Sequence, residues 1–201
     1  MASVYDLKPA FQRLLRPLVR GLARLGVSPN QITVGALLLS LLWGIAITLR
    51  PTSKGLLLAL PALLLLRMAL NAADGMLARE HDLRSPLGAL LNELGDVLSD
   101  STLYLPLALV PGFEPRLAVL TALAAAITEV AGLAALAVGA ERRYDGPMGK
   151  SDRALVFGLV GLLLGLGLAP HPWLLWVQGA VLALLAITIL RRVQGALRAA
   201  P

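Results

Sequence analysis

Residues 71–79 read Asn-Ala-Ala-Asp-Gly-Met-Leu-Ala-Arg, and Gly88, Asn92 and Asp96 follow at fixed spacings. Asn71 and Asp74 are three residues apart, and Asn92 and Asp96 are four apart, so each pair shares one face of a helix. Long apolar runs flank both pairs. Ionisable side chains in or beside a membrane span are costly and mark a functional site. The stretch therefore predicts two helices whose polar faces meet at one membrane boundary.

The composition supports a membrane protein. The 201-residue chain is 57% apolar, with a mean hydropathy of +0.76, whereas soluble domains are about 45–50% apolar. The absence of cysteine excludes disulfides and thiolate metal sites. The two histidines, His81 and His171, are far apart, which argues against a histidine-built site.

Six apolar segments have about the 20 residues that a membrane span needs. Breakers such as Pro111-Gly112 and Pro170-His171-Pro172 separate them. We therefore expect an all-α integral membrane protein with one domain over 1–201 and a six-helix bundle over 33–190. The expected spans are 33–49, 55–72, 86–110, 115–139, 153–169 and 173–190.

Residues 3–25 predict an amphipathic helix. Leucines such as Leu14, Leu18 and Leu22 follow helical spacing on one face, and Arg13, Arg16, Arg20 and Arg24 follow it on another. This pattern favours a helix that lies in the membrane interface, where anionic lipid attracts the arginines. A soluble helix packed on a partner is the alternative.

The distribution of lysine and arginine predicts the orientation. If the N-terminus is cytoplasmic, fourteen of these residues lie on the cytoplasmic side, whereas only Arg50, Lys54 and Arg116 lie on the other. Cytoplasmic loops carry the excess of positive charge. Both termini and the polar motif are therefore expected in the cytoplasm, on a multi-pass inner (plasma) membrane protein.

The motif side chains offer only oxygen ligands, from carboxylates and amides. Such ligands suit Mg²⁺ or Mn²⁺, and Mg²⁺ usually binds through a few carboxylates together with substrate phosphates. Asp100, one turn beyond Asp96, lies deeper on the same face. We expect the metal site to draw on Asn71, Asp74, Asn92, Asp96 and Asp100.

The spacing D/N-x2-D-G-x2-A-R-x8-G-x3-D/N-x3-D resembles the signature of the CDP-alcohol phosphotransferase family. Residues 28–33, Ser-Pro-Asn-Gln-Ile-Thr, look like that family's P-N-x-x-T segment, and the six-span layout agrees. The resemblance implies a membrane enzyme that transfers a phosphatidyl group from a CDP-linked donor, with CDP-diacylglycerol favoured, to an alcohol and releases CMP. It implies Asp74 as a metal ligand, Asp96 as both ligand and catalytic base, and a nucleotide site bordered by Gly75, Ala78, Arg79 and Gly88.

Asn71 and Asn92 stand where the family pattern has aspartate. Each change keeps an oxygen ligand and removes a negative charge. Three accounts are open: an active enzyme whose metal binds together with substrate, replacement of the lost charge by Glu93 or, in the favoured version, by Asp100, or loss of transfer chemistry with retained binding of lipid or nucleotide. A purely structural polar seam between helices is a further alternative.

A second polar cluster spans residues 141–153. Lys150, Arg153 and Arg142 are expected to hold the phosphate of a lipid or of an acceptor alcohol. The alternatives are a loop that only sets topology and capping of the fifth span by Ser151-Asp152. Glu129, inside the fourth span, is expected either to pair with Arg67 or to face the pocket.

The expected partners are a CDP-alcohol, an alcohol acceptor and membrane lipids, with no nucleic acid. The resemblance also implies a homodimer, and the small residues of 122–126 permit close helix packing. Inositol phosphate, glycerol phosphate and serine all remain open as acceptors.

Overall fold

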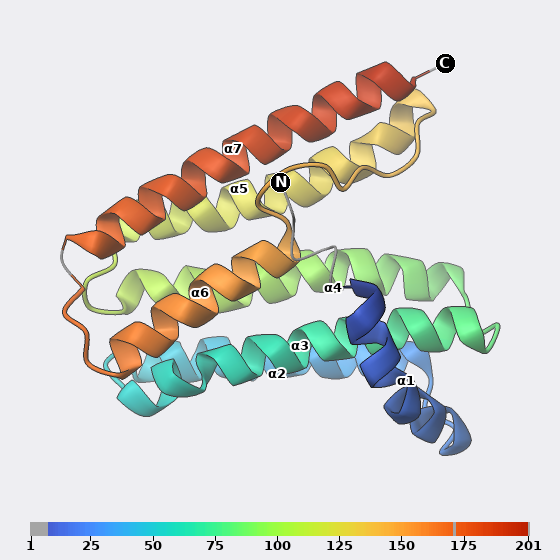
Figure 1. The fold of residues 1–201 in the computed structure, drawn as a ribbon, viewed down its shortest axis with the longest axis horizontal. Helices are drawn as coiled ribbons and strands as arrows, with labels where there is room; N and C mark the ends of the chain where they lie inside the picture. The colour runs from blue at the N-terminus through green and yellow to red at the C-terminus, as the bar shows by residue number, and fades with distance from the viewer. Residues whose placement is uncertain (1–7, 171, 201) are drawn as a thin grey trace.

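The structure is a computed structural model that describes residues 8–170 and 172–200. Within these ranges the regular elements are all helical (Figure 1). They are α1 (Lys8–Arg24), α2 (Pro29–Leu49), α3 (Lys54–Glu80), α4 (Pro86–Tyr104), η2 (Leu105–Leu109), α5 (Pro115–Ala134), η3 (Ala135–Val138), α6 (Lys150–Gly165) and α7 (Trp173–Ala199). The all-α class is as expected from the sequence.

The helices α2 to α7 run alternately up and down, and they pack chiefly as α3 on α6, α2 on α4 and α5 on α7. α4 also contacts α5, which joins the α5–α7 pair to the rest of the bundle (Figure 1). This alternation brings the end of α3, the start of α4 and the ends of α5 and α7 to one end of the bundle. That end carries the polar motif.

Small residues allow α6 to lie directly on α3. A Cβ atom on Gly161 would lie 3.0 Å from the carbonyl oxygen of Leu57, and one on Gly158 would lie 3.4 Å from Cα of Pro61. Larger side chains would push the helices apart. Around this contact, a core of buried apolar residues such as Leu64 and Phe157 fills the bundle.

Four helices are long and apolar enough to cross a membrane: Pro29–Leu49, Lys54–Glu80, Pro115–Val138 and Trp173–Ala199. α4 carries the acidic residues Glu93, Asp96 and Asp100, which lower its hydropathy. α6 has only 16 residues, about 24 Å at 1.5 Å per residue. α4 and α6 lie where two of the six spans were expected, but by composition and length alone neither counts as a membrane-spanning helix.

The first helix differs from the single leucine face expected for 3–25. Residues 3–7 lie outside the described part of the chain. In α1, Leu15 and Val19 are buried in a small apolar cluster with residues of α2 and α3, whereas Leu14 and Leu18 are exposed. The apolar residues of α1 therefore form two groups: one packs on α2 and α3, and the other lies on the exposed surface of the helix.

The alanine-rich segment 122–126 lies within α5. Ala122 and Ala125 are buried inside the chain. Two of the small residues that could permit close packing in a dimer therefore pack against other helices of the same chain.

Candidate active site

The two halves of the motif meet between α3 and α4. The side-chain nitrogen Nδ2 of Asn71 donates a hydrogen bond of 2.7 Å to Oδ1 of Asp96. Asp74 and Asp96 are both buried, at 4% and 5% exposure. The structure thus brings together the polar residues that the sequence placed on two neighbouring helix faces.

Asp74 is held by the first residues of α2. The hydroxyl of Thr33 lies 2.7 Å from Oδ2 of Asp74, to which it donates. Thr33 is placed by a capping box at the start of α2, in which the Ser28 hydroxyl accepts from the Gln31 backbone and the Gln31 side chain accepts from the Ser28 backbone. Such a box fixes the helix start by satisfying its free N–H groups. The Ser-Pro-Asn-Gln-Ile-Thr segment therefore orients a motif carboxylate.

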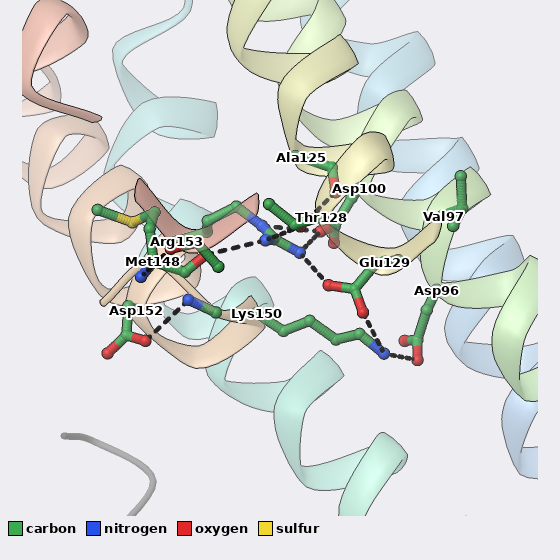
Figure 2. Close-up of polar contacts among 12 residues, drawn as sticks. Asp96, Val97, Asp100, Ala125, Thr128, Glu129, Met148, Lys150, Asp152 and Arg153 are labelled. Carbon is green, nitrogen blue, oxygen red and sulfur yellow. Dashed lines mark hydrogen bonds and ion pairs between the residues drawn. The ribbon is translucent and has the colours of Figure 1, made fainter. Parts of the chain in front are cut away.

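Asp96 is engaged from a distant part of the chain. Nζ of Lys150, at the start of α6, forms an ion pair with Oδ2 of Asp96 (Figure 2). Arg67 lies on the other side, with Nη2 3.6 Å from Oδ1 of Asp96 and 3.3 Å from its carbonyl oxygen. Both carboxylate oxygens of Asp96 therefore face a hydrogen-bond donor or a cation.

Asp100 lies between two arginines. Nη1 of Arg67 is 2.6 Å from Oδ1 of Asp100, and Nη2 of Arg153 is 2.6 Å from Oδ2. Arg153 is fully buried and also contacts Glu129 at 3.0 Å. This differs from the expectation that Asp100 supplies a metal ligand and that Arg153 holds a phosphate, because each is already paired with the other.

Glu129 of α5 lies at the centre of the cations. Its carboxylate lies 3.0 Å from Arg153, 3.4 Å from Arg142, 3.5 Å from Arg192 and 3.9 Å from Lys150. Figure 2 shows it between Lys150 and Arg153. Of the two roles left open for Glu129, pairing with Arg67 is therefore not the one observed.

Positive and negative charges balance in this network. Arg142 also forms an ion pair with Glu93. Counted together with Asp74, which forms no ion pair in the described part of the chain, the site holds five cations and five carboxylates: Arg67, Arg142, Lys150, Arg153 and Arg192, and Asp74, Glu93, Asp96, Asp100 and Glu129. Burying charges is costly unless they are paired, and aspartate at positions 71 and 92 would leave two negative charges in excess.

Asp152 caps the start of α6, which is the alternative role expected from the sequence for Ser151-Asp152. Its carboxylate accepts a hydrogen bond of 3.0 Å from the backbone N–H of Gly149, just before α6. This contact fixes the start of the helix that presents Lys150 and Arg153.

The residues that the family resemblance assigns to a nucleotide line the α3–α4 end of the motif. A Cβ atom on Gly75 would lie 3.1 Å from Nη1 of Arg79, so the arginine folds back over that glycine. A Cβ atom on Gly88 would lie 2.7 Å from Oδ1 of Asn30, so a side chain there would displace the Asn30 amide of α2. Ala78 is half-buried on the same helix as Gly75.

The oxygen donors fit a divalent metal only in part. Among residues 8–170 and 172–200, no three His, Cys, Asp or Glu side chains are grouped to hold a metal ion. Asp74 accepts from the Thr33 hydroxyl and forms no ion pair in the described part of the chain, and within the same ranges Asn92 makes no side-chain hydrogen bond. One or two carboxylates with amide oxygens suit a Mg²⁺ ion that substrate phosphates complete.

Several residues of this site were not identified from the sequence: Thr33, Arg67, Thr128 and Arg192. The sequence could have pointed to Arg67, because a charged side chain inside an apolar span needs an ionic or hydrogen-bonding partner. The sequence could not have pointed to Arg192, because the several arginines near the C-terminus are equally well explained by the excess of positive charge in cytoplasmic segments.

Comparisons with known proteins match most of the chain. The sequence model of a family described as CDP-alcohol phosphatidyltransferase matches residues 26–190. Inner membrane protein YnbA of Escherichia coli is 46% identical, over 90% of this chain and 91% of that protein. Phosphatidylinositol phosphate synthase of Mycolicibacterium smegmatis is 30% identical, over 100% of this chain and 91% of that protein.

Solved structures show the same fold. Phosphatidylinositol phosphate synthase of Mycobacterium tuberculosis with CDP-DAG bound superposes with a TM-score of 0.76 at 20% identity, covering 92% of this chain and 94% of that one. The same protein in complex with manganese and citrate gives a TM-score of 0.75, covering 90% and 88% of the two chains.

Proposed function

Because the chain belongs to the CDP-alcohol phosphatidyltransferase family, we propose that it transfers a phosphatidyl group from CDP-diacylglycerol to an alcohol and releases CMP, as a step of phospholipid biosynthesis. The observation that carries the proposal is the Asn71–Asp96 hydrogen bond, which joins the two halves of the motif around buried carboxylates. The relative solved with CDP-DAG shares the fold and supports this choice of donor.

In the proposed reaction, the acceptor hydroxyl oxygen attacks the phosphorus that carries the diacylglycerol. A new P–O bond forms, the P–O bond to CMP breaks, and the hydroxyl proton passes to Asp96. Phosphoryl transfer depends mainly on positioning and charge neutralisation, and a positioned carboxylate contributes as a general base. Asp96 is the motif carboxylate that both Asn71 and Lys150 orient.

Lys150 links donor binding to this base. Its side chain is 27% exposed, against 15% for Arg142 and 0% for Arg153. We propose that Lys150 moves from Asp96 to an incoming phosphate, which leaves the carboxylate able to accept a proton. Arg142 and Arg153 act through Glu93, Glu129 and Asp100, which they hold in place.

The proposed nucleotide site consists of Gly75, Ala78, Arg79 and Gly88. Neither glycine has a side chain that would hold a ligand away from the backbone, and the side chains that lie over them, Arg79 and Asn30, would have to move aside. Arg79 is exposed beside them and supplies a cation for the pyrophosphate.

For the metal, we propose Asn71, Asp74, Asn92 and Asp96 as the oxygen ligands of Mg²⁺ or Mn²⁺, without Asp100. When bound together with the donor, the ion would neutralise charge on the pyrophosphate and on departing CMP. Lys150 controls the binding of this ion, because it is paired with Asp96 until the phosphate of the donor draws the lysine away.

We further propose that all six helices α2 to α7 cross the inner membrane, with α1 at its surface and both termini in the cytoplasm. The count of positive charges supports this orientation, and the exposed leucines of α1 support an interfacial position. Membrane lipids would then surround the bundle. A homodimer completes the proposal, by analogy with the family.

The charge balance of the site also favours a second candidate, a non-catalytic lipid- or nucleotide-binding protein on this fold. Binding of CMP to the purified protein, followed by calorimetry with and without Mg²⁺, is expected under both. Release of CMP from CDP-diacylglycerol separates them, because only the enzyme produces it.

A further inference from the structure

A second cluster of cations lies outside the active-site network. A cavity of about 490 Å³ opens between the loop after α5 and the last turns of α7, and Arg143, Arg191 and Arg198 are among its lining residues. Arg191 and Arg198 are exposed, and neither forms an ion pair within the described part of the chain. They differ in this from the five cations of the active site, which carboxylates neutralise.

The wall of the cavity is built by close contacts between the loop and α7. A Cβ atom on Gly195 would lie 2.9 Å from Nε of Arg143, and one on Gly146 would lie 2.6 Å from Cγ2 of Thr188. Gly146 also has a φ of +119°, which side chains rarely allow. The loop can therefore lie against the helix because Gly146 is a glycine, and Gly195 leaves the space that the Arg143 side chain occupies.

Arg143 is fixed in direction. Its Nε and Nη2 donate to Asp145 at 2.7 and 3.0 Å. Its backbone N–H donates to Gly132 of α5, and Arg192 donates to the carbonyl of Asp145. The hydrogen bond from Arg143 lowers the pKa of Asp145, so this carboxylate stays ionised and cancels one of the three positive charges.

The other two cations follow one face of α7. Arg191, Gln194 and Arg198 are spaced by three and four residues and so lie above one another along the helix. Together with Arg143 they give the cavity a net charge of about +2 beside a neutral amide donor, by counting its lining residues. Guanidinium groups match phosphate oxygens in charge and in planar geometry.

We propose that this cavity binds a phosphate group, carried either by a water-soluble phosphate ester or by the headgroup of an anionic lipid. The cavity is distinct from the Asp96 site and its occupation does not depend on the transfer reaction. It lies at the end of the bundle where α7 ends, so a ligand from either source can reach it.

The test compares the wild type with R191Q/R198Q, in phosphatidylcholine nanodiscs for the phosphate arm and in mixed micelles for the lipid arm. The control, R50Q/R116Q, removes two exposed arginines at the opposite end of the bundle, which form no ion pair within the described part of the chain. One arm titrates inorganic phosphate by calorimetry at low salt. The other measures, by native mass spectrometry, the retention of phosphatidylglycerol from mixed micelles. R191K/R198K keeps both charges and is expected to fall between the wild type and R191Q/R198Q.

We expect R191Q/R198Q to weaken binding about tenfold or more, because charge-assisted hydrogen bonds are lost, and the control to change it by less than about twofold. Loss in the phosphate arm identifies a soluble ester, and loss in the lipid arm alone identifies a headgroup. Binding that is absent in both arms, or equal in R191Q/R198Q and the control, overturns the proposal. Neither arm measures turnover, so failure of the phosphate-site proposal can be distinguished from failure of the transferase proposal.

Discussion

Lys150 forms an ion pair with Asp96, although 54 positions separate them in the sequence. The lysine supplies one positive charge where a divalent ion is expected in this family. Asn71 and Asn92 remove two negative charges from the same place. The lysine and the two asparagines are compatible with each other, because a site with fewer carboxylates is one that a single lysine can neutralise. Metal binding in this chain is therefore expected to depend on where Lys150 lies.

Lys150→Met tests this dependence. The change keeps most of the apolar stem and removes the cation from Asp96, so the affinity for Mn²⁺ without nucleotide is expected to rise about tenfold or more, since two unit charges 4 Å apart interact by about 4 kcal/mol near a protein surface. Electron paramagnetic resonance of free Mn²⁺ measures it. Lys54→Met, at the opposite end of α3, is the control. Equal affinity in the wild type and Lys150→Met would refute the dependence.

Asp96→Asn tests the proposed base. The amide keeps the size of the side chain and cannot accept the proton, so turnover is expected to fall by about 10²–10⁴-fold. Asp82→Asn is the matched control, because Asp82 is exposed and its φ of 54° is one that asparagine tolerates. CMP release measures both. Retention of full activity in Asp96→Asn would remove this residue from the mechanism.

Thr33→Val removes the hydroxyl that donates to Asp74 while keeping the shape of the side chain. Leaving a buried carboxylate without this donor is expected to cost about 1–3 kcal/mol, seen as weaker CMP binding or lower thermal stability. Thr48→Val is the comparison, because within the described residues that hydroxyl donates to the carbonyl of Gly44 in its own helix and to no carboxylate. If both variants behave alike, Thr33 has no special role at the site.

Arg153→Met tests whether the buried network is cooperative. Removing one partner of a buried pair costs about 3–5 kcal/mol, so the unfolding temperature in detergent is expected to drop well below that of the exposed control Arg116→Met. Asp100 keeps Arg67 as a partner in that variant, but the network is left with one negative charge in excess, so adding Asp100→Asn to Arg153→Met should recover part of the loss. A double variant that is no more stable than Arg153→Met would show that Asp100 and Arg153 are not energetically coupled.

Local patterns were sufficient to predict the helices. Hydropathy and breakers such as Pro111-Gly112 predicted elements near those observed, and helical spacing predicted that Asn71 and Asp96 share a polar seam. α4 and α6 do not meet the simple criterion for a membrane span, because α4 carries Glu93, Asp96 and Asp100 and α6 has only 16 residues.

Partner choice among the charges could not be predicted. Spacing shows that Arg67 and Glu129 need partners, but which partners depends on how α3, α5 and α6 pack. The observed answer pairs Arg67 with Asp100 and Glu129 with Arg153. The same packing turns Arg153 inward and leaves Arg191 and Arg198 on an open cavity.

The most direct test of the central claim is CMP release by purified protein in nanodiscs with CDP-diacylglycerol, Mg²⁺ or Mn²⁺ and a panel of acceptors: inositol phosphate, glycerol phosphate and serine. We predict acceptor-dependent release with at least one of them, lost in Asp96→Asn. No release with any acceptor, while Asn71→Asp with Asn92→Asp restores it, would contradict the account, because the asparagines would then mark a fold that binds without transferring.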